Sequence, residues 1–308
     1  MKIYIFFFLV HWLVLLLFAP LFIGVVTRVK AIFAGRVGPS VLQPYYDLFR
    51  LLNKKCVYSR TTTWVFRAAP VVVFSAISAV SLIVPFGPFA APVQFAGDIF
   101  LAVYLLALSR FFMIIAAWDT GSSFEGLGAA REAFFSCFAE LALFMNFITL
   151  AVSARSFSLS QMIGANVFIL WKLLGPAFLL VIASFFIVLL AENCRIPVDD
   201  PDTHLELTMI HEVMILDNSG VDLAYMLYAG AAKFFIFAGI LVPILFPFKT
   251  GIFFTDSGIF FLSMLAISIV VGLVESGMAR LRFGRIRGLL LMAFALAFFG
   301  FIVALWRV

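Results

Sequence analysis

Long apolar runs separated by short polar stretches dominate the chain. Eight runs are long enough to cross a ~30 Å hydrocarbon layer as helices rising ~1.5 Å per residue. They cover residues 3–26, 64–86, 98–118, 133–152, 167–191, 223–246, 258–278 and 288–306. Because backbone polar groups in lipid need internal partners, such runs form α-helices. The pattern predicts an all-α polytopic membrane protein with about eight transmembrane helices.

A shorter pattern follows the first run. Polar residues recur at i, i+4, i+7 and i+11, at Gln43, Asp47, Arg50 and Lys54. The opposite face is apolar and holds Val41, Leu42, Tyr45, Leu48, Phe49 and Leu52. This spacing predicts an amphipathic surface helix. It lies either along the membrane as a generic interfacial helix or under a docked subunit.

The chain shows no internal repeat and no Ser/Gly-rich linker. The simplest expectation is a single membrane domain over residues 1–308. The first run is longer than a signal-peptide core and has one positive charge, Lys2, ahead of it, so it is expected to be a retained anchor.

Composition agrees with lipid as the solvent, since 65% of residues are hydrophobic and 12% are charged. The net charge is +5, and the basic residues are concentrated in the loops after the first and seventh runs. By the positive-inside rule these loops are cytoplasmic, which places both termini on the non-cytoplasmic side of an inner membrane. Basic excess of this kind marks loops and does not indicate nucleic-acid binding.

Metal chemistry has little support in the sequence. Cys56, Cys137 and Cys194 lack CxxC spacing, so neither a zinc nor an iron–sulfur site is indicated, and redox centres are expected in partner chains. His204, Glu206 and His211 remain a weak alternative set of ligands without an HExxH motif. His11 is expected to pack or to donate a hydrogen bond.

Ionisable residues at membrane depth are costly and therefore indicate function. Glu132, Ser136 and Glu140 share one broad helix face, about 12 Å from first to last. Two interpretations stay open: a proton ladder with water in its gaps, or carboxylates neutralised by Arg131 or Arg110. Further buried candidates are Arg110, Lys172, Lys233 and Glu275, and Arg110 and Lys233 are each expected to face an acid from another helix.

The segment between the fifth and sixth runs is acidic. Its acids are Glu192, Asp199, Asp200, Asp202, Glu206, Glu212, Asp217 and Asp222, accompanied by Arg195. A solvated charge run is the usual explanation of such a stretch. Interleaved apolar residues instead predict a loop partly buried against protein, where neighbouring carboxylates raise one another's pKa. Such a loop suits a proton or cation entry path.

Three stretches carry a family resemblance, and a fourth distinguishes a branch of the family. The three are GRVGPSVLQPYYDLFRLL from Gly35, AAWDTGSSFEGLGAAREAFFSCFAE from Ala116 and AENCRIPVDDPDTHLELTMIHEVMILDNSG from Ala191, and the fourth is VESGMARLR from Val274, which agrees with the hydrogenase branch. The chain resembles the subunit that anchors the redox arm of respiratory complex I to its membrane arm (the subunit 1 family). The resemblance is closer to the counterpart in group 4 nickel–iron (NiFe) hydrogenases and formate hydrogenlyase, of the hydrogenase-4 component C type.

The resemblance implies roles at matching positions. Ion-pathway positions are Glu132, Glu140, Glu192, Asp199, Asp202, Glu206, Glu212 and Asp217, and charge partners are Arg110, Arg131, Arg195, Lys233 and Glu275. The partner-docking loop holds Arg36, Gly38, Pro39, Gln43 and Asp47. Implied partners are soluble hydrogenase-like large and small subunits, which would carry the NiFe and iron–sulfur centres, and antiporter-like membrane subunits.

One departure concerns quinone. Complex I relatives usually carry a longer Arg-x-Gly-Pro-Asn segment with a second Gly-Pro, whereas here Arg36-Val37-Gly38-Pro39-Ser40 leads directly to Val41-Leu42-Gln43. The shortened form argues against quinone binding and favours hydrogenase-type relatives.

The sequence therefore predicts a membrane anchor of an energy-converting redox complex that couples electron transfer to H⁺ or Na⁺ movement without a catalytic centre of its own. Three alternatives remain: a quinone-reducing NADH dehydrogenase-type subunit, a stand-alone ion carrier, and a purely structural anchor. A carrier would be favoured by inverted repeats or paired broken helices, which the sequence lacks.

Overall fold

The computed structural model describes residues 2–164, 167–199, 209–248 and 250–307. Its helices are α1 (Lys2–Phe33), α2 (Gln43–Leu52), α3 (Trp64–Ser81), α4 (Asp98–Asp119), α5 (Ser123–Ala154), α6 (Leu159–Met162), α7 (Val167–Glu192), α8 (His211–Met214), α9 (Gly220–Leu245), α10 (Phe253–Gly277) and α11 (Phe283–Arg307). Within these residues, eight helices are long and apolar enough to cross a membrane: α1, α3, α4, α5, α7, α9, α10 and α11. The predicted all-α polytopic class is confirmed.

Helix boundaries depart from the apolar runs where polar groups join a helix. The fourth run was expected from residue 133, but α5 begins at Ser123 and includes Glu125, Arg131 and Glu132. Conversely, α3 ends at Ser81, because Pro85 and Gly87 follow and Phe86 pairs with Phe89 in a turn. Hydropathy marks the lipid-compatible part of a helix and not its ends.

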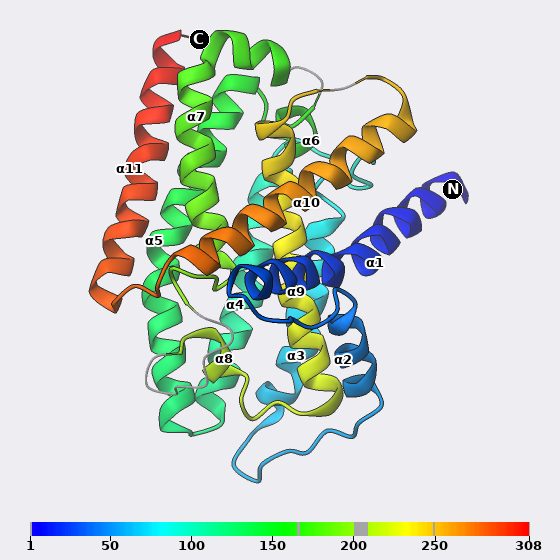
Figure 1. The fold of residues 1–308 in the computed structure, drawn as a ribbon, viewed down its shortest axis with the longest axis vertical. Helices are drawn as coiled ribbons and strands as arrows, with labels where there is room; N and C mark the ends of the chain where they lie inside the picture. Colours follow the sequence, from blue (N-terminus) through cyan, green and yellow to red (C-terminus); the bar gives the residue numbers. More distant parts are fainter. Residues whose placement is uncertain (1, 165–166, 200–208, 249, 308) are drawn as a thin grey trace.

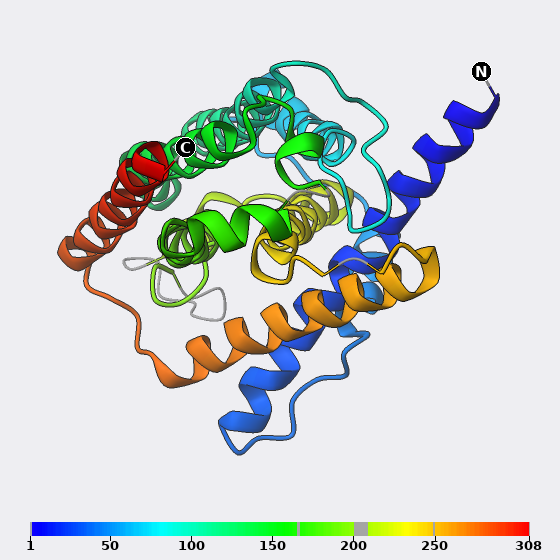
Figure 2. The same ribbon diagram turned by 90° about the horizontal axis from the view of Figure 1, so that it is seen from above.

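Two helices form the interior of the bundle. Seen from above, α7 and α9 lie inside a curved row made by α3, α4, α5 and α11, and the inclined helices α1 and α10 close the other side (Figure 2). Helix α9 is the most enclosed of the eight spans. Helices α1 and α10 cross closely, and a Cβ on Gly272 would lie 2.9 Å from the Val29 side chain. Helices α2 and α8 lie toward one end of the bundle, the lower end in Figure 1.

The predicted amphipathic surface helix exists as α2. Leu48 is buried and Asp47 borders a cavity, whereas Phe49 and Leu52 of the apolar face are 72% and 50% exposed on this chain. Leu48 and the Tyr45 hydroxyl, which donates to the Leu17 carbonyl, fix the helix against α1 and α9. Amphipathic spacing alone could not show which face those contacts would turn inward.

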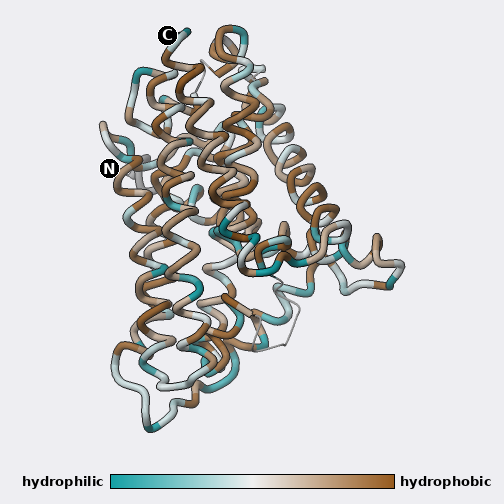
Figure 3. Tube along the Cα trace, turned by 90° about the vertical axis from the view of Figure 1, so that its left-hand side faces the viewer, coloured by the Kyte–Doolittle hydropathy of each residue, from teal (hydrophilic) through white to brown (hydrophobic). Residues whose placement is uncertain are grey.

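The segment after α7 folds back against protein. Helix α8 packs on α5 so closely that a Cβ on Gly128 would lie 2.2 Å from Cγ1 of Val213. Buried apolar side chains in this segment are Ile196, Val198, Met209, Ile210, Val213 and Met214. Figure 3 shows hydrophobic colouring along the long helices and hydrophilic colouring mainly toward their ends and in the connections between them. The described part of the segment is therefore a partly buried loop, as predicted.

Candidate functional site

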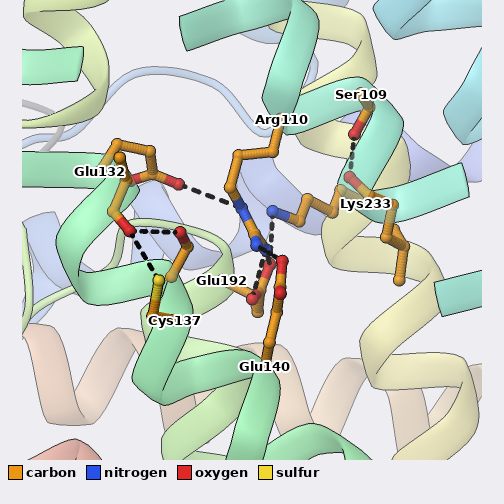
Figure 4. Close-up of polar contacts among 10 residues, drawn as sticks. Ser109, Arg110, Glu132, Cys137, Glu140, Glu192 and Lys233 are labelled. Carbon is orange, nitrogen blue, oxygen red and sulfur yellow. Dashed lines mark hydrogen bonds and ion pairs between the residues drawn. The ribbon is translucent and has the colours of Figure 1, made fainter. Parts of the chain in front are cut away.

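The centre of the candidate site is Arg110, which is buried within α4. Its Nη1 donates to Glu140 of α5, and its Nη2 lies 2.5 Å from both carboxylate oxygens of Glu192 at the end of α7. Its Nε lies 3.5 Å from Oε1 of Glu132, also on α5. Figure 4 shows the three carboxylates around one guanidinium.

A second cation completes this group. Nζ of Lys233, on α9, lies 2.7 Å from Oε2 of Glu192. The expectation that Arg110 and Lys233 each face an acid from another helix is confirmed. We refer to Arg110, Glu132, Glu140, Glu192 and Lys233 as the Arg110 cluster. Three acids against two bases give it a net charge of −1 when all are ionised, and buried charges of this kind are stable only when paired.

The geometry bears on the two interpretations of Glu132, Ser136 and Glu140, which share one face of α5. Glu132 and Glu140 converge on Arg110, and the Ser136 hydroxyl donates to the Ala133 carbonyl of its own helix and does not bridge them. Arg131 donates to the Met209 carbonyl at 3.0 Å and lies over the Phe283 ring. Neutralisation by Arg110 therefore describes these contacts, while the carboxylates' roles in ion movement stay predictions.

A second buried ion-pair group lies beside the first. Glu275, at the end of α10, lies 3.3 Å from Nη1 of Arg195 and 3.8 Å from Nζ of Lys30 in α1. Arg195 follows Glu192 by three residues, so a short stretch of backbone joins both groups. Glu275 and Arg195 were predicted as charge partners; Lys30 was counted only as a loop charge, because sequence cannot show that α1 and α10 cross.

Asp199 anchors the folded-back segment. Its Oδ2 accepts the backbone N–H groups of Ile210 and His211 at 3.0 Å each, and its Oδ1 lies 2.9 Å from Arg280. These contacts cap the start of α8 and join it to the connection between α10 and α11. Arg280 was not predicted as a site residue, although it lies within the VESGMARLR stretch.

Other predicted positions are dispersed. Asp217 is exposed, and its backbone N–H donates to buried Glu125, an acid that sequence reasoning missed. Glu212 is half-buried, whereas Asp202 and Glu206 lie outside the described residues. Lys172 was expected to be buried, but it is exposed over the Phe168 ring, because it lies on the outer side of the first turns of α7. His11 packs as expected, with Nε2 2.8 Å from the Ser81 carbonyl.

The predicted docking loop has local partners of its own. Arg36 and Pro39 are exposed, and the carbonyls of Gly38 and Pro39 accept from Arg28. The Gln43 side chain donates to Asp47 at 3.1 Å within α2.

A cavity of about 380 Å³ connects the Arg110 cluster with α2. Its charged lining includes Arg110, Glu192, Lys233, Arg195 and Asp47, and its apolar lining comes from α1, α3 and α9. His211 also borders it. Burial, with the nearby charges of Lys233 and Arg195, lowers the pKa of His211 to about 4. The imidazole is therefore neutral at physiological pH.

The described residues contain no group of three or more His, Cys, Asp or Glu side chains arranged to hold a metal ion. Burial raises the pKa of the Cys194 thiol well above its ordinary value, so Cys194 is not a ready thiolate ligand. The alternative ligands His204 and Glu206 lie outside the described residues.

Eight helices long and apolar enough to cross a membrane, packed around a buried ion-pair cluster, define a polytopic membrane protein with ionisable side chains inside its bundle. A family model described as NADH dehydrogenase matches residues 5–305, and the chain belongs to this family.

Relatives come from two kinds of complex. The chain is 29% identical to hydrogenase-4 component C of Escherichia coli K12, over 92% of this chain and 90% of that protein. It is also 29% identical to formate hydrogenlyase subunit 4 of the same organism, covering 96% of each. A third relative, a subunit of the NADH-quinone oxidoreductase of Rubrobacter xylanophilus, is 32% identical over 56% of this chain and 53% of its own length.

A solved structure shares the fold. A chain of the membrane-bound sulfane sulfur reductase, an archaeal respiratory membrane complex, superposes with a TM-score of 0.82 over 96% of this chain and 99% of its own. At 19% identity this likeness shows the fold alone.

Proposed function

We propose that this chain anchors an energy-converting redox complex, of the group 4 NiFe hydrogenase or formate hydrogenlyase type, to the inner membrane and couples its electron transfer to H⁺ or Na⁺ movement. The two relatives that align over nearly their whole length are components of a hydrogenase and of a formate hydrogenlyase, which supports this type. The soluble arm, with its metal centres, would dock at the cytoplasmic end formed by α2 and α8, and antiporter-like chains would lie alongside in the membrane.

The observation that carries the proposal is the charge imbalance of the Arg110 cluster. Glu132 and Glu192 share one guanidinium, and one proton or cation would change the cluster from −1 to neutral. A buried site that can exist in two charge states suits coupling better than a charge-balanced structural ion pair does.

The cavity supplies a route to this site. It extends from α2 and His211, where a soluble arm would dock, to Arg110, Glu192 and Lys233. In the proposed mechanism, electron transfer and proton uptake in the docked arm change the charge of the segment that contains Glu192 and Asp217. The segment then shifts between two arrangements and passes the change to Glu132 and Glu140.

The test is Glu132→Gln in the assembled complex in sealed vesicles. Removing this carboxylate leaves Arg110 and Lys233 balanced by Glu140 and Glu192, so the bundle is expected to assemble. Ion uptake per electron should fall by about 10²-fold, the lower end of what a positioned proton-transfer group contributes. Electron transfer to a soluble acceptor should continue.

The matched control is Asp98→Asn, which alters a buried carboxylate at the other end of α4 that accepts from Ser158 and Leu159. Uptake in this variant should stay at the parental level. Normal uptake by an intact Glu132→Gln complex would contradict the coupling role.

The cavity also favours a second candidate, a quinone-reducing subunit. Its volume is within the range of small-molecule sites, and Leu48, Val73 and Ile77 could pack on a quinone ring whose oxygen approaches His211. This candidate requires that quinone analogues block electron transfer through the complex.

A further inference from the structure

One member of the Arg110 cluster is open to the outside of the bundle. The side chain of Glu140 is 35% exposed, whereas those of Arg110, Glu132 and Glu192 are 6%, 11% and 2% exposed. Glu140 does not line the cavity that Arg110 and Glu192 share. Its exposed part therefore faces outward and not into that internal space.

Glu140 lies within the hydrocarbon layer. Arg155, the first charged residue toward the far end of α5, is fifteen positions away, or about 22 Å of helix. A ~30 Å layer beginning there would extend about 8 Å beyond Glu140. The position of α11 agrees with this depth. Phe135 stacks on Phe283 at the start of α11, and Glu140 lies five positions, about 7.5 Å, further along α5 into the bundle.

Lipid is a poor neighbour for this carboxylate. An ionised acid at membrane depth costs about 2.5 kcal/mol or more, and reaching the interface requires a long side chain such as that of Lys or Arg. Glu140 is short and is held inward by Arg110. Its exposed side therefore needs a polar neighbour that lipid does not supply.

The surface around Glu140 is otherwise apolar. On α5, Phe134, Cys137 and Leu141 are exposed within six positions of Glu140, and on α4, which contacts α5, Leu108 and Phe111 are exposed within two positions of Arg110. We call these residues, with Glu140, the α4/α5 face. An exposed apolar surface that includes one carboxylate has the pattern of an interface between membrane helices, where a polar contact adds to close packing.

We propose that a transmembrane helix of another chain covers the α4/α5 face and presents a basic or hydrogen-bond-donating side chain to Glu140. Charge complementarity selects this occupant, because Glu140 is the accessible carboxylate of a cluster in which three acids face two bases. A second copy of this chain would bring a second acidic cluster to the contact. The depth excludes a soluble subunit. The inference rests on the proposed function only in assuming that the neighbour is another membrane chain of the same complex.

The experiment is site-specific photo-crosslinking in the assembled complex in native membranes. Phe134 and Leu141 are each replaced by p-benzoylphenylalanine, and Leu262 on α10, which is 68% exposed and has no ionisable residue within a turn, is the matched control. Two test positions guard against one that impairs assembly, and co-purification with the soluble subunits is checked before irradiation. Adducts are identified by mass spectrometry.

The expected result is that the Phe134 or Leu141 variant forms an adduct with a different, multi-span chain and that the Leu262 variant does not. This adduct should be lost when Glu140→Lys is added and kept when Glu140→Gln is added. Adducts with lipid alone, with a second copy of this chain or with a soluble subunit would overturn the proposal. So would an adduct that persists unchanged with Glu140→Lys. These outcomes are separate from ion uptake, so the interface can stand even if the Glu132→Gln test contradicts coupling.

Discussion

Individual residues at this site act as a set. Arg110 offers its guanidinium to three carboxylates, and removing it would leave Glu192, whose side chain is 2% exposed, with Lys233 as its remaining basic contact. Breaking a buried ion pair by removing one partner costs about 3–5 kcal/mol, far more than an exposed pair contributes. The Arg110 cluster is therefore held as a unit, and single substitutions report on the whole group.

His211 provides a pH-dependent readout at the residue scale. Its pKa is about 4 in the folded chain against an ordinary value of 6.5, so between these values the unfolded chain binds one more proton. Stability should therefore fall as the pH drops from 6.5 toward 4. We predict that His211→Gln loses less thermal stability than the parent between about pH 7 and about pH 5, a window that spans the ordinary histidine pKa.

The measurement is the unfolding temperature of the purified complex at both pH values. All other titratable groups are common to the two proteins, so a difference in how far the unfolding temperature changes between the two pH values is due to His211. An identical shift in both would contradict a neutral, half-buried imidazole.

At the scale of elements, the contact between α5 and α8 decides where the acidic segment lies. Helix α8 is a single turn and is kept in place by Asp199 and by close packing on Gly128. A Cβ at Gly128 would also lie 2.9 Å from the Ile210 carbonyl, which cannot move without breaking the cap. The glycine is thus a packing requirement for the segment.

We predict that Gly128→Ala destabilises the folded chain by about 1–3 kcal/mol, the usual cost of overpacking. The matched control is Gly126→Ala in the same helix, where a Cβ would have its nearest neighbour, Trp118, at 3.8 Å. This control should be neutral or stabilising by up to about 1 kcal/mol, because alanine favours helix. Unfolding temperatures and protease sensitivity at residues 209–219 provide the measurement; equal effects of both substitutions would contradict the proposed packing role.

At the scale of the whole molecule, eight crossings and the distribution of basic residues predict the orientation in the membrane. The connection after α1 carries Arg36, Lys54 and Lys55 and is expected in the cytoplasm. Both termini and the start of α10 then lie on the other side.

This topology predicts opposite labelling of two exposed positions. Val37→Cys, at a residue 98% exposed, should resist an impermeant maleimide in intact cells, whereas Phe254→Cys, at a residue 84% exposed, should react. Both are made in a background where Cys56, Cys137 and Cys194 are serine, and both should react after permeabilisation. Labelling of Val37→Cys in intact cells would reverse the proposed orientation.

Sequence reasoning reached some residues of the site and missed others for a common reason. Arg110, Lys233 and Glu275 were found because a charge inside an apolar run is conspicuous. Lys30, Arg280 and Glu125 were missed because each lies near a helix end or in a connection between helices, where a charge is ordinary. For Lys172 the same rule failed, since its place on the outer side of α7 depends on how that helix packs.

The sequence by itself determined the solvent, the helical class, the number of spans and the set of charges that lipid would not tolerate, because each of these follows from local composition and periodicity. Only the tertiary structure decided which charges meet. That three acids from two helices share Arg110, that Lys233 joins them, and that Glu140 keeps an exposed side while it pairs with Arg110 all depend on helix rotation and crossing. Those are fixed by close contacts such as Gly128 with Val213 and Gly272 with Val29, between residues far apart in the chain.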